Sequence, residues 1–220
     1  MVYLFCGYRK WSLELYEKLS KTNYDFKLIS SPKKLTYNIV KRLNPDLIFF
    51  PDWSWKVPNE IINNYQCICF HESDLPKFRG GSPLQNQIIR GIKKTKTTAF
   101  LMNEKIDGGD ILLKKNLSLN GSLDEIFSRM IENDYQLIKK IINNNYSLKK
   151  QTGAPTFFKR RKPHESELKS VNITLTKLYD FIRMLDDPYP NAFIKIGKRK
   201  LFLKNPTLKN NKLTFNGELV

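Results

Sequence analysis

The feature that most constrains the fold of this 220-residue chain is an alternation of two sequence patterns along its first two thirds. Short apolar runs typical of β-strands occupy residues 2–6, 25–30 and 47–50, and between them residues 11–19 and 35–43 repeat apolar positions at helical spacing. Strands that are separated by helices usually pair in parallel, and the helices then cover the faces of the sheet. The sequence therefore predicts an α/β fold, with a Rossmann-like, mostly parallel sheet and helices on both faces.

The same alternation continues to about residue 145. A helix at residues 59–64, a strand at 67–70, a helix at 83–91 and strands at 97–102 and 111–119 are expected in that order. Ser122 and Glu125 form a capping-box sequence, which predicts a helix that continues through Met130 and Ile141. Residues 1–150 are therefore expected to form one large domain.

The composition changes after residue 150. Residues 151–162 are polar and basic and predict a connector, and residues 175–185 place Leu178, Ile182 and Leu185 on one face of a helix. Short strands are expected at residues 192–196, 200–203 and 212–215. Residues 151–220 are therefore predicted to be a linker and a small, β-rich C-terminal subdomain.

The chain is strongly basic, with 38 Lys and Arg residues against 21 Asp and Glu residues and a formal charge of +17. This charge makes an anionic partner the default expectation: a nucleic acid, a nucleotide-linked substrate or an acidic membrane surface. A solvated basic face without a function is the alternative, because many of the lysines stand near asparagines, as in residues 139–145 and 204–212.

Hydropathy and cysteine spacing exclude several classes. No apolar run approaches the ~20 residues that a membrane-spanning helix needs, and the N-terminus lacks a basic region before its apolar stretch, so we expect a cytoplasmic protein without membrane insertion. Cys6, Cys67 and Cys69 have the spacing neither of a disulfide framework nor of a zinc site, so we expect no bound metal.

Two side chains follow predicted strands and are candidates for catalysis. His71 follows the run at residues 67–70, and an α/β sheet places its active site at the carboxyl ends of its strands. Asp107 lies in the turn Asp-Gly-Gly-Asp after the run at residues 97–102. Each has an ordinary alternative, a hydrogen-bonded structural histidine or a turn aspartate that bonds its own backbone. Neither residue alone establishes a catalytic site.

The segments around these two residues are more specific. Residues 70–85 read Phe-His-Glu-Ser-Asp-Leu-Pro-Lys-Phe-Arg-Gly-Gly-Ser-Pro-Leu-Gln, and residues 102–112 read Met-Asn-Glu-Lys-Ile-Asp-Gly-Gly-Asp-Ile-Leu. A histidine before Ser-x-Leu-Pro-x-x-Arg-Gly, with an Asp-x-Gly turn further on, resembles the folate-dependent formyltransferase family, which includes methionyl-tRNA formyltransferases and sugar N-formyltransferases. Residues 158–167 and 179–193 are most similar to the stretch that joins the catalytic domain of sugar N-formyltransferases to a small β unit.

The resemblance implies catalytic roles for His71 and Asp107, and it places Cys69 where the family has an asparagine. Because a thiol is a weak hydrogen-bond donor, a backbone amide or His71 would have to stabilise the developing oxyanion, or the enzyme is slower or altered. The implied co-substrate is 10-formyltetrahydrofolate. The residues expected to bind it are Trp53, Ser54, Trp55, Asn103, Lys105 and Ile106. The residues expected to bind the acceptor are Lys77, Arg79, Gly80, Gly81, Gln85 and Tyr189, with Arg9, Lys10 and Trp11 on the same side.

We therefore expect an enzyme that transfers a formyl group to the amine of a nucleotide-linked amino sugar, of the dTDP- or UDP-4-amino-4,6-dideoxy sugar type, in polysaccharide biosynthesis. Formylation of methionyl-tRNA is the alternative, which the basic charge favours and the short chain disfavours. A non-catalytic folate- or nucleic-acid-binding relative is a third interpretation. The short strands of the tail also leave a homodimer open.

Overall fold

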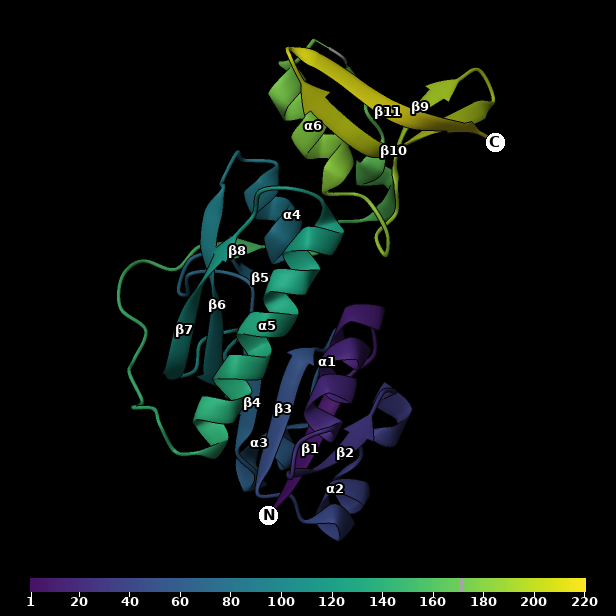
Figure 1. The fold of residues 1–220 in the computed structure, drawn as a ribbon. Coiled ribbons are helices and arrows are strands. Elements are labelled where there is room, and N and C mark those ends of the chain that lie inside the picture. Colours follow the sequence, from purple (N-terminus) through teal and green to yellow (C-terminus); the bar gives the residue numbers. More distant parts are fainter. Residues whose placement is uncertain (171) are drawn as a thin grey trace.

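The central sheet of the protein has six strands. The structure is a computed structural model that describes residues 1–170 and 172–220. The strands lie in the order β2 (Asp25–Ile29), β1 (Val2–Gly7), β3 (Leu47–Asp52), β4 (Cys67–His71), β6 (Lys94–Leu101) and β7 (Ile111–Ser118). The first four are parallel, and β6 and β7 add an antiparallel hairpin to β4 (Figure 1). The mostly parallel sheet is confirmed.

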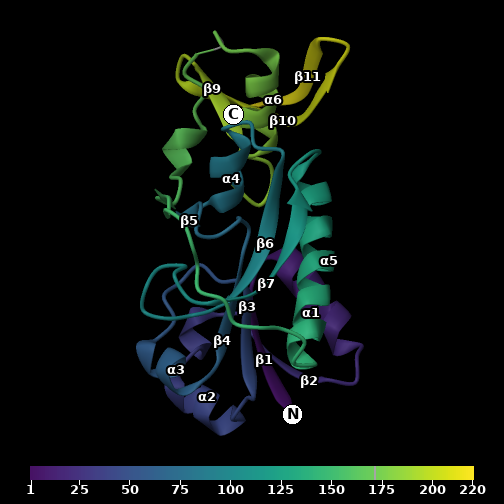
Figure 2. The same cartoon turned by 90° about the vertical axis from the view of Figure 1, so that its left-hand side faces the viewer.

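Helices cover both faces of this sheet, as predicted. Figure 2 shows α1 (Lys10–Ser20) and α5 (Leu123–Ile142) on one side and α2 (Tyr37–Leu43) and α3 (Asn59–Asn64) on the other. The alternation of side chains along a strand explains the two layers, because neighbouring residues point to opposite faces. Phe5 packs with Leu15 of α1 in one apolar cluster, whereas Leu4 packs with Val40 and Ile61 in the other.

The longest helix begins where the capping box predicts. Ser122 Oγ accepts a hydrogen bond from the Glu125 amide, and the Glu125 carboxylate accepts one from the Ser122 amide. The short α4 (Pro83–Ile88) ends before the predicted Gly91. In the part of the chain that the structure describes, no helix is long and apolar enough to cross a membrane.

The C-terminal unit consists of one helix and one antiparallel sheet. The helix α6 (Leu175–Arg183) packs against the sheet, whose order is β11 (Lys212–Leu219), β10 (Arg199–Lys209) and β9 (Ala192–Ile196) (Figure 1). Strands β10 and β11 are longer than predicted, because Asn210 and Asn211 adopt positive φ angles of 50° and 54° in a tight turn and let the hairpin extend. Such turns match the twist of the two strands that they join.

This unit is joined to the main domain by a buried polar contact as well as by apolar packing. The Arg183 side chain is 2% exposed, donates to the carbonyl oxygens of Leu119 and Gly121, and forms an ion pair with the buried Asp180. Lys93 of the main domain also pairs with Asp180 at 2.9 Å. The C-terminal unit therefore has a defined position on the main domain.

The connector between the two units runs along the loop that follows His71. Its strand β8 (Phe157–Phe158) pairs in parallel with β5 (Arg79–Gly80), and the Phe158 ring stacks on Phe78 with centroids 4.8 Å apart. The Thr156 hydroxyl accepts a hydrogen bond from the Phe78 amide at 2.8 Å. The connector is therefore part of the scaffold around His71. Two short 3₁₀ helices, η1 (Pro32–Lys34) and η2 (Pro163–Ser166), complete the structure.

Candidate active site

His71 is the last residue of β4, and its ring has a defined tautomer. Its Nε2 lies 2.7 Å from the carbonyl oxygen of Phe78, and because a carbonyl oxygen can only accept, Nε2–H is the donor. Phe78 adopts a positive φ of 59°, which turns its carbonyl towards the ring. The neutral imidazole therefore carries its lone pair on Nδ1, which lies 3.7 Å from Oδ2 of Asp107.

Asp107 is held by hydrogen bonds from two separate segments. Its Oδ2 accepts from the Gly80 amide at 2.7 Å. Nε2 of Gln151, in the connector, donates to the carbonyl oxygens of Asp107 and Gly109, each at 2.8 Å. The Arg79 guanidinium in turn donates to Oε1 of Gln151 at 2.7 and 3.2 Å. Since Asp107 has a positive φ of 46°, these bonds maintain a turn that a non-glycine residue rarely adopts alone.

The turn also depends on close packing at Gly109. A Cβ added to Gly109 would lie 1.6 Å from the carbonyl oxygen of Leu101, far inside van der Waals contact. The glycine is therefore required by the approach of β6, and the short Asp-Gly-Gly-Asp turn brings Asp107 within reach of His71.

Two cavities meet beside His71 and Asp107. We call the first the tryptophan cavity; its volume is about 650 Å³, and Trp53, Trp55, Met102, Ile106 and Cys69 are among its lining residues. We call the second the Tyr189 cavity; its volume is about 340 Å³, and it includes Arg9, Asp52, His71, Glu72, Gln85 and Tyr189. Trp53, Ser54, Cys69, Gly80, Gly81, Asp107 and Arg160 line both.

All six residues predicted to bind the folate line the tryptophan cavity: Trp53, Ser54, Trp55, Asn103, Lys105 and Ile106. The two indole rings meet edge to face, with centroids 5.2 Å apart. Trp55 is 41% exposed, and in the described part of the chain the buried Nε1 of Trp53 has no hydrogen-bond partner. Neither tryptophan is in a strand, because β3 ends at Asp52. Their rings are therefore presented by a loop at the carboxyl end of the sheet.

Most of the residues predicted to bind the acceptor come together, and two do not. Gly80, Gly81, Gln85 and Tyr189 line the Tyr189 cavity. Lys77 lies outside it: the tight turn from Asp74 to Lys77 and the positive φ of Phe78 reverse the chain, so its exposed side chain lines two other cavities, with Asp74 and Lys96. The Arg79 side chain also lies outside, because its guanidinium bonds Gln151. The structure thus places these two side chains away from the Tyr189 cavity, and their contact with an acceptor stays a prediction.

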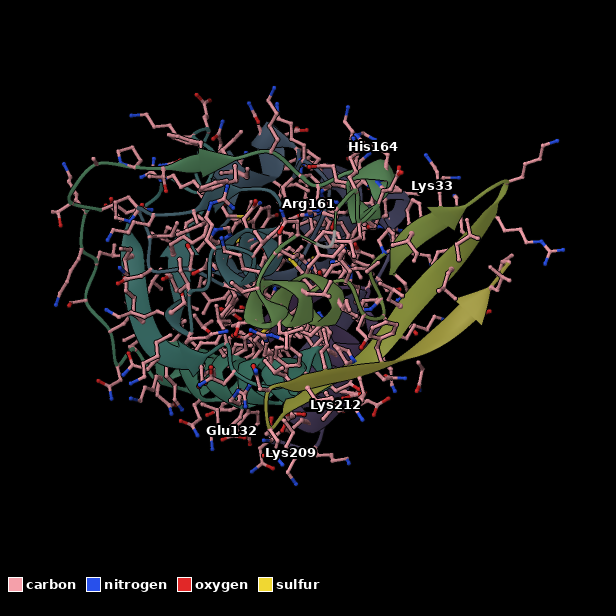
Figure 3. The ribbon with its side chains drawn as sticks, turned by 90° about the horizontal axis from the view of Figure 1, so that it is seen from above. Lys33, Glu132, Arg161, His164, Lys209 and Lys212 are labelled. Atoms are coloured by element: carbon pink, nitrogen blue, oxygen red, sulfur yellow. The ribbon has the colours of Figure 1, made fainter. Side chains whose placement is uncertain are left out.

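Several residues of the site were missed by the sequence analysis. Asp52 at the end of β3 and Glu72 directly after His71 occupy strand ends, a position that could have indicated them. Arg160 and Arg161 reach the cavity from the connector, and Figure 3 labels Arg161 near the middle of the view from above. Gln151, 44 positions after Asp107, had no signal in the sequence.

The ionisable groups of the Tyr189 cavity are strongly affected by burial. Arg9 forms an ion pair with Asp52 and also donates to it through its amide at 3.1 Å. Burial nevertheless raises the pKa of Asp52 above its ordinary value. Burial raises the pKa of Glu72 to about 7 and that of Tyr189 to about 12. The Tyr189 phenol is therefore neutral, and Glu72 titrates near neutral pH.

Cys69 lies at the junction of the two cavities as a neutral thiol. Burial raises its pKa well above the ordinary value, and nearby carboxylates, Asp107 first among them, add to the shift. Its Sγ lies 3.7 Å from the carbonyl oxygen of Phe70, which follows it. Cys69 is therefore unsuited to act as a nucleophile. Among residues 1–170 and 172–220, no group of three or more His, Cys, Asp and Glu side chains could hold a metal ion.

Comparison with protein families gives two matches. Residues 18–142 match the model described as formyl transferase, and residues 163–216 match the one described as the C-terminal domain of methionyl-tRNA formyltransferase. The first match includes β4 and the turn with Asp107, and the second includes α6 and most of the C-terminal sheet.

Among curated proteins, the methionyl-tRNA formyltransferase of Bacillus mycoides is 33% identical over 173 residues, which is 75% of this chain and 55% of that protein. The chain thus spans about half the length of the curated relatives that it matches. Among solved structures, the methionyl-tRNA formyltransferase of Clostridium thermocellum superposes with a TM-score of 0.95 at 41% identity, and 100% of this chain and 99% of that chain are covered.

A sugar N-formyltransferase from a Shewanella species also superposes, with a TM-score of 0.73 at 21% identity over 93% of this chain and 97% of that chain. At this identity the similarity shows a common fold.

Proposed function

The chain belongs to the formyl transferase family, and on that premise we propose that it transfers a formyl group from 10-formyltetrahydrofolate to the amine of methionyl-tRNA. The observation that carries the proposal is the junction of the two cavities. Because Cys69, Gly80 and Asp107 line both, a donor in one and an amine in the other meet beside His71.

The tryptophan cavity fits the donor in size and chemistry. Its volume of about 650 Å³ suits a small molecule, and Phe50, Phe100 and Met102 extend the apolar lining that a flat pterin and a benzoyl ring require. The unpartnered Nε1 of Trp53 and the side chain of Asn103 offer polar contacts. When bound, the donor supplies the formyl carbon and the nitrogen that leaves.

His71 provides the base. Because Nε2–H donates to the Phe78 carbonyl, Nδ1 takes the proton that the amine releases as it attacks. The imidazolium that results lies between that carbonyl oxygen and the Asp107 carboxylate, and both stabilise it. The same imidazolium can deliver its proton to the leaving nitrogen.

The developing negative charge on the formyl oxygen needs a donor, and the Cys69 thiol is a weak one. The protonated Nδ1 of His71 is the charged donor of this site, 3.7 Å from Asp107. We infer that His71 performs both tasks, proton transfer and charge stabilisation. With a cysteine at position 69 in place of the family's asparagine, charge stabilisation thus depends more on His71, and formyl transfer is still possible.

The sequence motifs favour a nucleotide-linked sugar as the acceptor. The distribution of charge in the structure favours tRNA instead. A diphosphate inside the Tyr189 cavity would lie among Asp52, Glu72 and Asp107 as well as Arg160 and Arg161, because the cavity contains acids and bases together. Outside the cavity the charge is one-sided. The segment 192–220 has seven Lys and Arg residues and one Glu, and Figure 3 shows Lys209 and Lys212 at the periphery, at the β10–β11 turn.

This arrangement suits an acceptor whose amine enters the cavity while its phosphates remain outside. Lysines that neutralise RNA phosphates release counterions, which makes binding dependent on salt. The 41% identity to a methionyl-tRNA formyltransferase over the whole chain supports the same acceptor.

The test is to incubate the purified chain with 10-formyltetrahydrofolate and methionyl-initiator tRNA, and in parallel with dTDP- and UDP-linked 4-amino sugars. Mass spectrometry then reports which acceptor gains a formyl group. We expect formylmethionyl-tRNA, at a rate that falls as salt rises, and loss of product in His71→Gln and Asp107→Asn. Product only with a sugar would replace the acceptor, and the absence of product with every amine would refute formyl transfer.

A further inference from the structure

The Tyr189 cavity contains one carboxylate that the mechanism above leaves without a role. Asp107 orients His71, and Asp52 forms an ion pair with Arg9. Glu72 lines the same cavity, half-buried, and within the described residues no Lys, Arg or His side chain forms an ion pair with it. Its carbonyl oxygen accepts a hydrogen bond from Gln87 at 2.6 Å, which holds the backbone next to His71 in place.

The charged and titratable groups that face Glu72 come from every element around it. They are His71 and Cys69 of β4, Arg9 before α1, Asp52 of β3, Asp134 of α5 and Tyr189 after α6. Asp134 is 1% exposed, and in the described part of the chain neither of its carboxylate oxygens has a hydrogen-bond partner. Burial is the largest influence on Glu72 and raises its pKa to about 7, with a smaller contribution from Asp52, although His71 and Arg9 act in the opposite direction.

Proton accounting shows why a second base is needed. An acceptor α-amine has an ordinary pKa of about 8, so at neutral pH it arrives largely as an ammonium ion. It must lose one proton before it can attack and a second as the amide forms. His71 has a single free lone pair, on Nδ1, and that lone pair serves the second proton. The first proton needs another acceptor in the same cavity.

We propose that Glu72 binds the ammonium group of the acceptor and takes its first proton, a step that rests on the formyl transfer proposed above. The carboxylate and the ammonium become a carboxylic acid and a neutral amine. The freed lone pair forms the new carbon–nitrogen bond, and the bond from the formyl carbon to the donor nitrogen breaks. The proton that passes to His71 goes to that nitrogen, and the proton on Glu72 returns to solvent, so one formamide, one tetrahydrofolate and one proton are produced.

Glu72 also selects among acceptors in this scheme. A carboxylate beside Asp52 attracts a cation and repels an anion, so a primary amine is favoured over a phosphate at this point of the cavity. The group is suited to an acceptor whose ammonium has a pKa close to its own, because proton transfer is then nearly balanced.

The test compares Glu72→Gln, which keeps the shape of the side chain and removes its charge, with Glu132→Gln as the matched control. Glu132 is an exposed residue of α5 that pairs with Lys18 and is labelled at the periphery in Figure 3. We measure kcat/KM for the amine acceptor from about pH 6 to about pH 9 and expect Glu72→Gln to lose about 10²-fold near pH 7, as for a general base. Glu132→Gln should match the wild type.

The shape of the pH profile separates this role from a structural one. In the wild type kcat/KM should fall at high pH. There the acceptor amine has lost its proton and its positive charge, so it no longer forms an ion pair with the Glu72 carboxylate. In Glu72→Gln only the neutral amine reacts, so the alkaline fall should disappear and the loss should narrow as the pH rises. Glu72→Asp keeps a carboxylate and should keep the bell-shaped profile. Donor binding, followed by the fluorescence of the two tryptophans of the tryptophan cavity, should be unchanged in both variants.

Two results would overturn the inference. A Glu72→Gln profile that is lowered evenly, or not at all, while the wild type forms product would remove Glu72 from the proton path and leave formyl transfer intact. A wild-type chain that formylates no amine would remove both.

Discussion

Gln151 provides the sharpest test of how the connector supports the catalytic turn. Gln151→Leu would remove two hydrogen bonds to the carbonyl oxygens of Asp107 and Gly109 and two from the Arg79 guanidinium. A hydrogen bond contributes about 1 kcal/mol net, and the two bonds from the half-exposed Arg79 share one acceptor, Oε1 of Gln151, so they count as one. We therefore expect the free energy of unfolding to fall by about 3 kcal/mol. For a chain of this size that corresponds to a decrease in Tm of about 6–12 °C.

The effect on catalysis should be larger than the loss of stability suggests. Asp107 keeps its positive φ through these bonds, and a displacement of about 1 Å in a catalytic group can reduce the rate by about 10²-fold. We therefore expect kcat to fall more than the donor KM rises. The control is Gln136→Leu, an exposed glutamine on α5 that bonds Glu132 and Lys115.

The assay combines thermal unfolding with steady-state kinetics at a temperature where both variants are folded. A Gln151→Leu enzyme with kcat/KM within about threefold of the wild type would refute the argument, because that is far below the loss expected from a displaced catalytic group. A decrease of the same size in Gln136→Leu would show that any glutamine produces it. An unchanged Tm would show that the four bonds contribute nothing net.

Three other substitutions test separate parts of the structure. Cys69→Ala should lower kcat by less than about tenfold in single-turnover assays, because a thiol is a weak donor, whereas a strong oxyanion donor contributes about 10²–10³-fold. Arg183→Met should reduce the free energy of unfolding in urea by about 3–5 kcal/mol, because two carbonyl oxygens lose their buried donor, at about 1–3 kcal/mol each, and Asp180 keeps only Lys93 as a partner. Lys204→Met, at an exposed pair with Glu218, should change it by less than about 1 kcal/mol. Burial raises the pKa of Asp134 well above 3.8, so the folded state keeps this proton to higher pH than the unfolded state. The resulting stabilisation is complete below pH 3.8 and is lost as the pH rises above it, so Asp134→Asn should flatten this decline in urea stability.

The fold was predictable because hydrophobic periodicity reports burial directly. Residues 67–70 read as a buried strand and form one, and the capping box at Ser122 sets the start of α5. Two apolar runs on either side of a glycine-containing turn predict two strands there, and these strands form the hairpin of β6 and β7. In each case, the signal and the structure depend on neighbours within a few positions of the chain.

The site was predictable only where the main chain alone places a residue. His71 and Gly80 lie where a strand and its following loop put them. The side chains of Lys77 and Arg79 point elsewhere because Phe78 between them has a positive φ, which reverses the direction that an extended chain would have. Gln151 reaches Asp107 across 44 positions, and no local pattern reports such a contact.

The path of the connector has a consequence for where this protein can be cut. A fragment that stopped at residue 150 would keep His71 and Asp107 in its sequence, yet it would lack Gln151. It would also lack the Thr156 hydroxyl, which accepts a hydrogen bond from the Phe78 amide, and the strand β8, which pairs with β5. Protease nicking between residues 150 and 160, or a gene truncated there, should therefore silence the reaction while leaving the six-stranded sheet folded. For protein engineering, a fragment that is meant to keep the proposed catalytic turn must extend beyond Phe158.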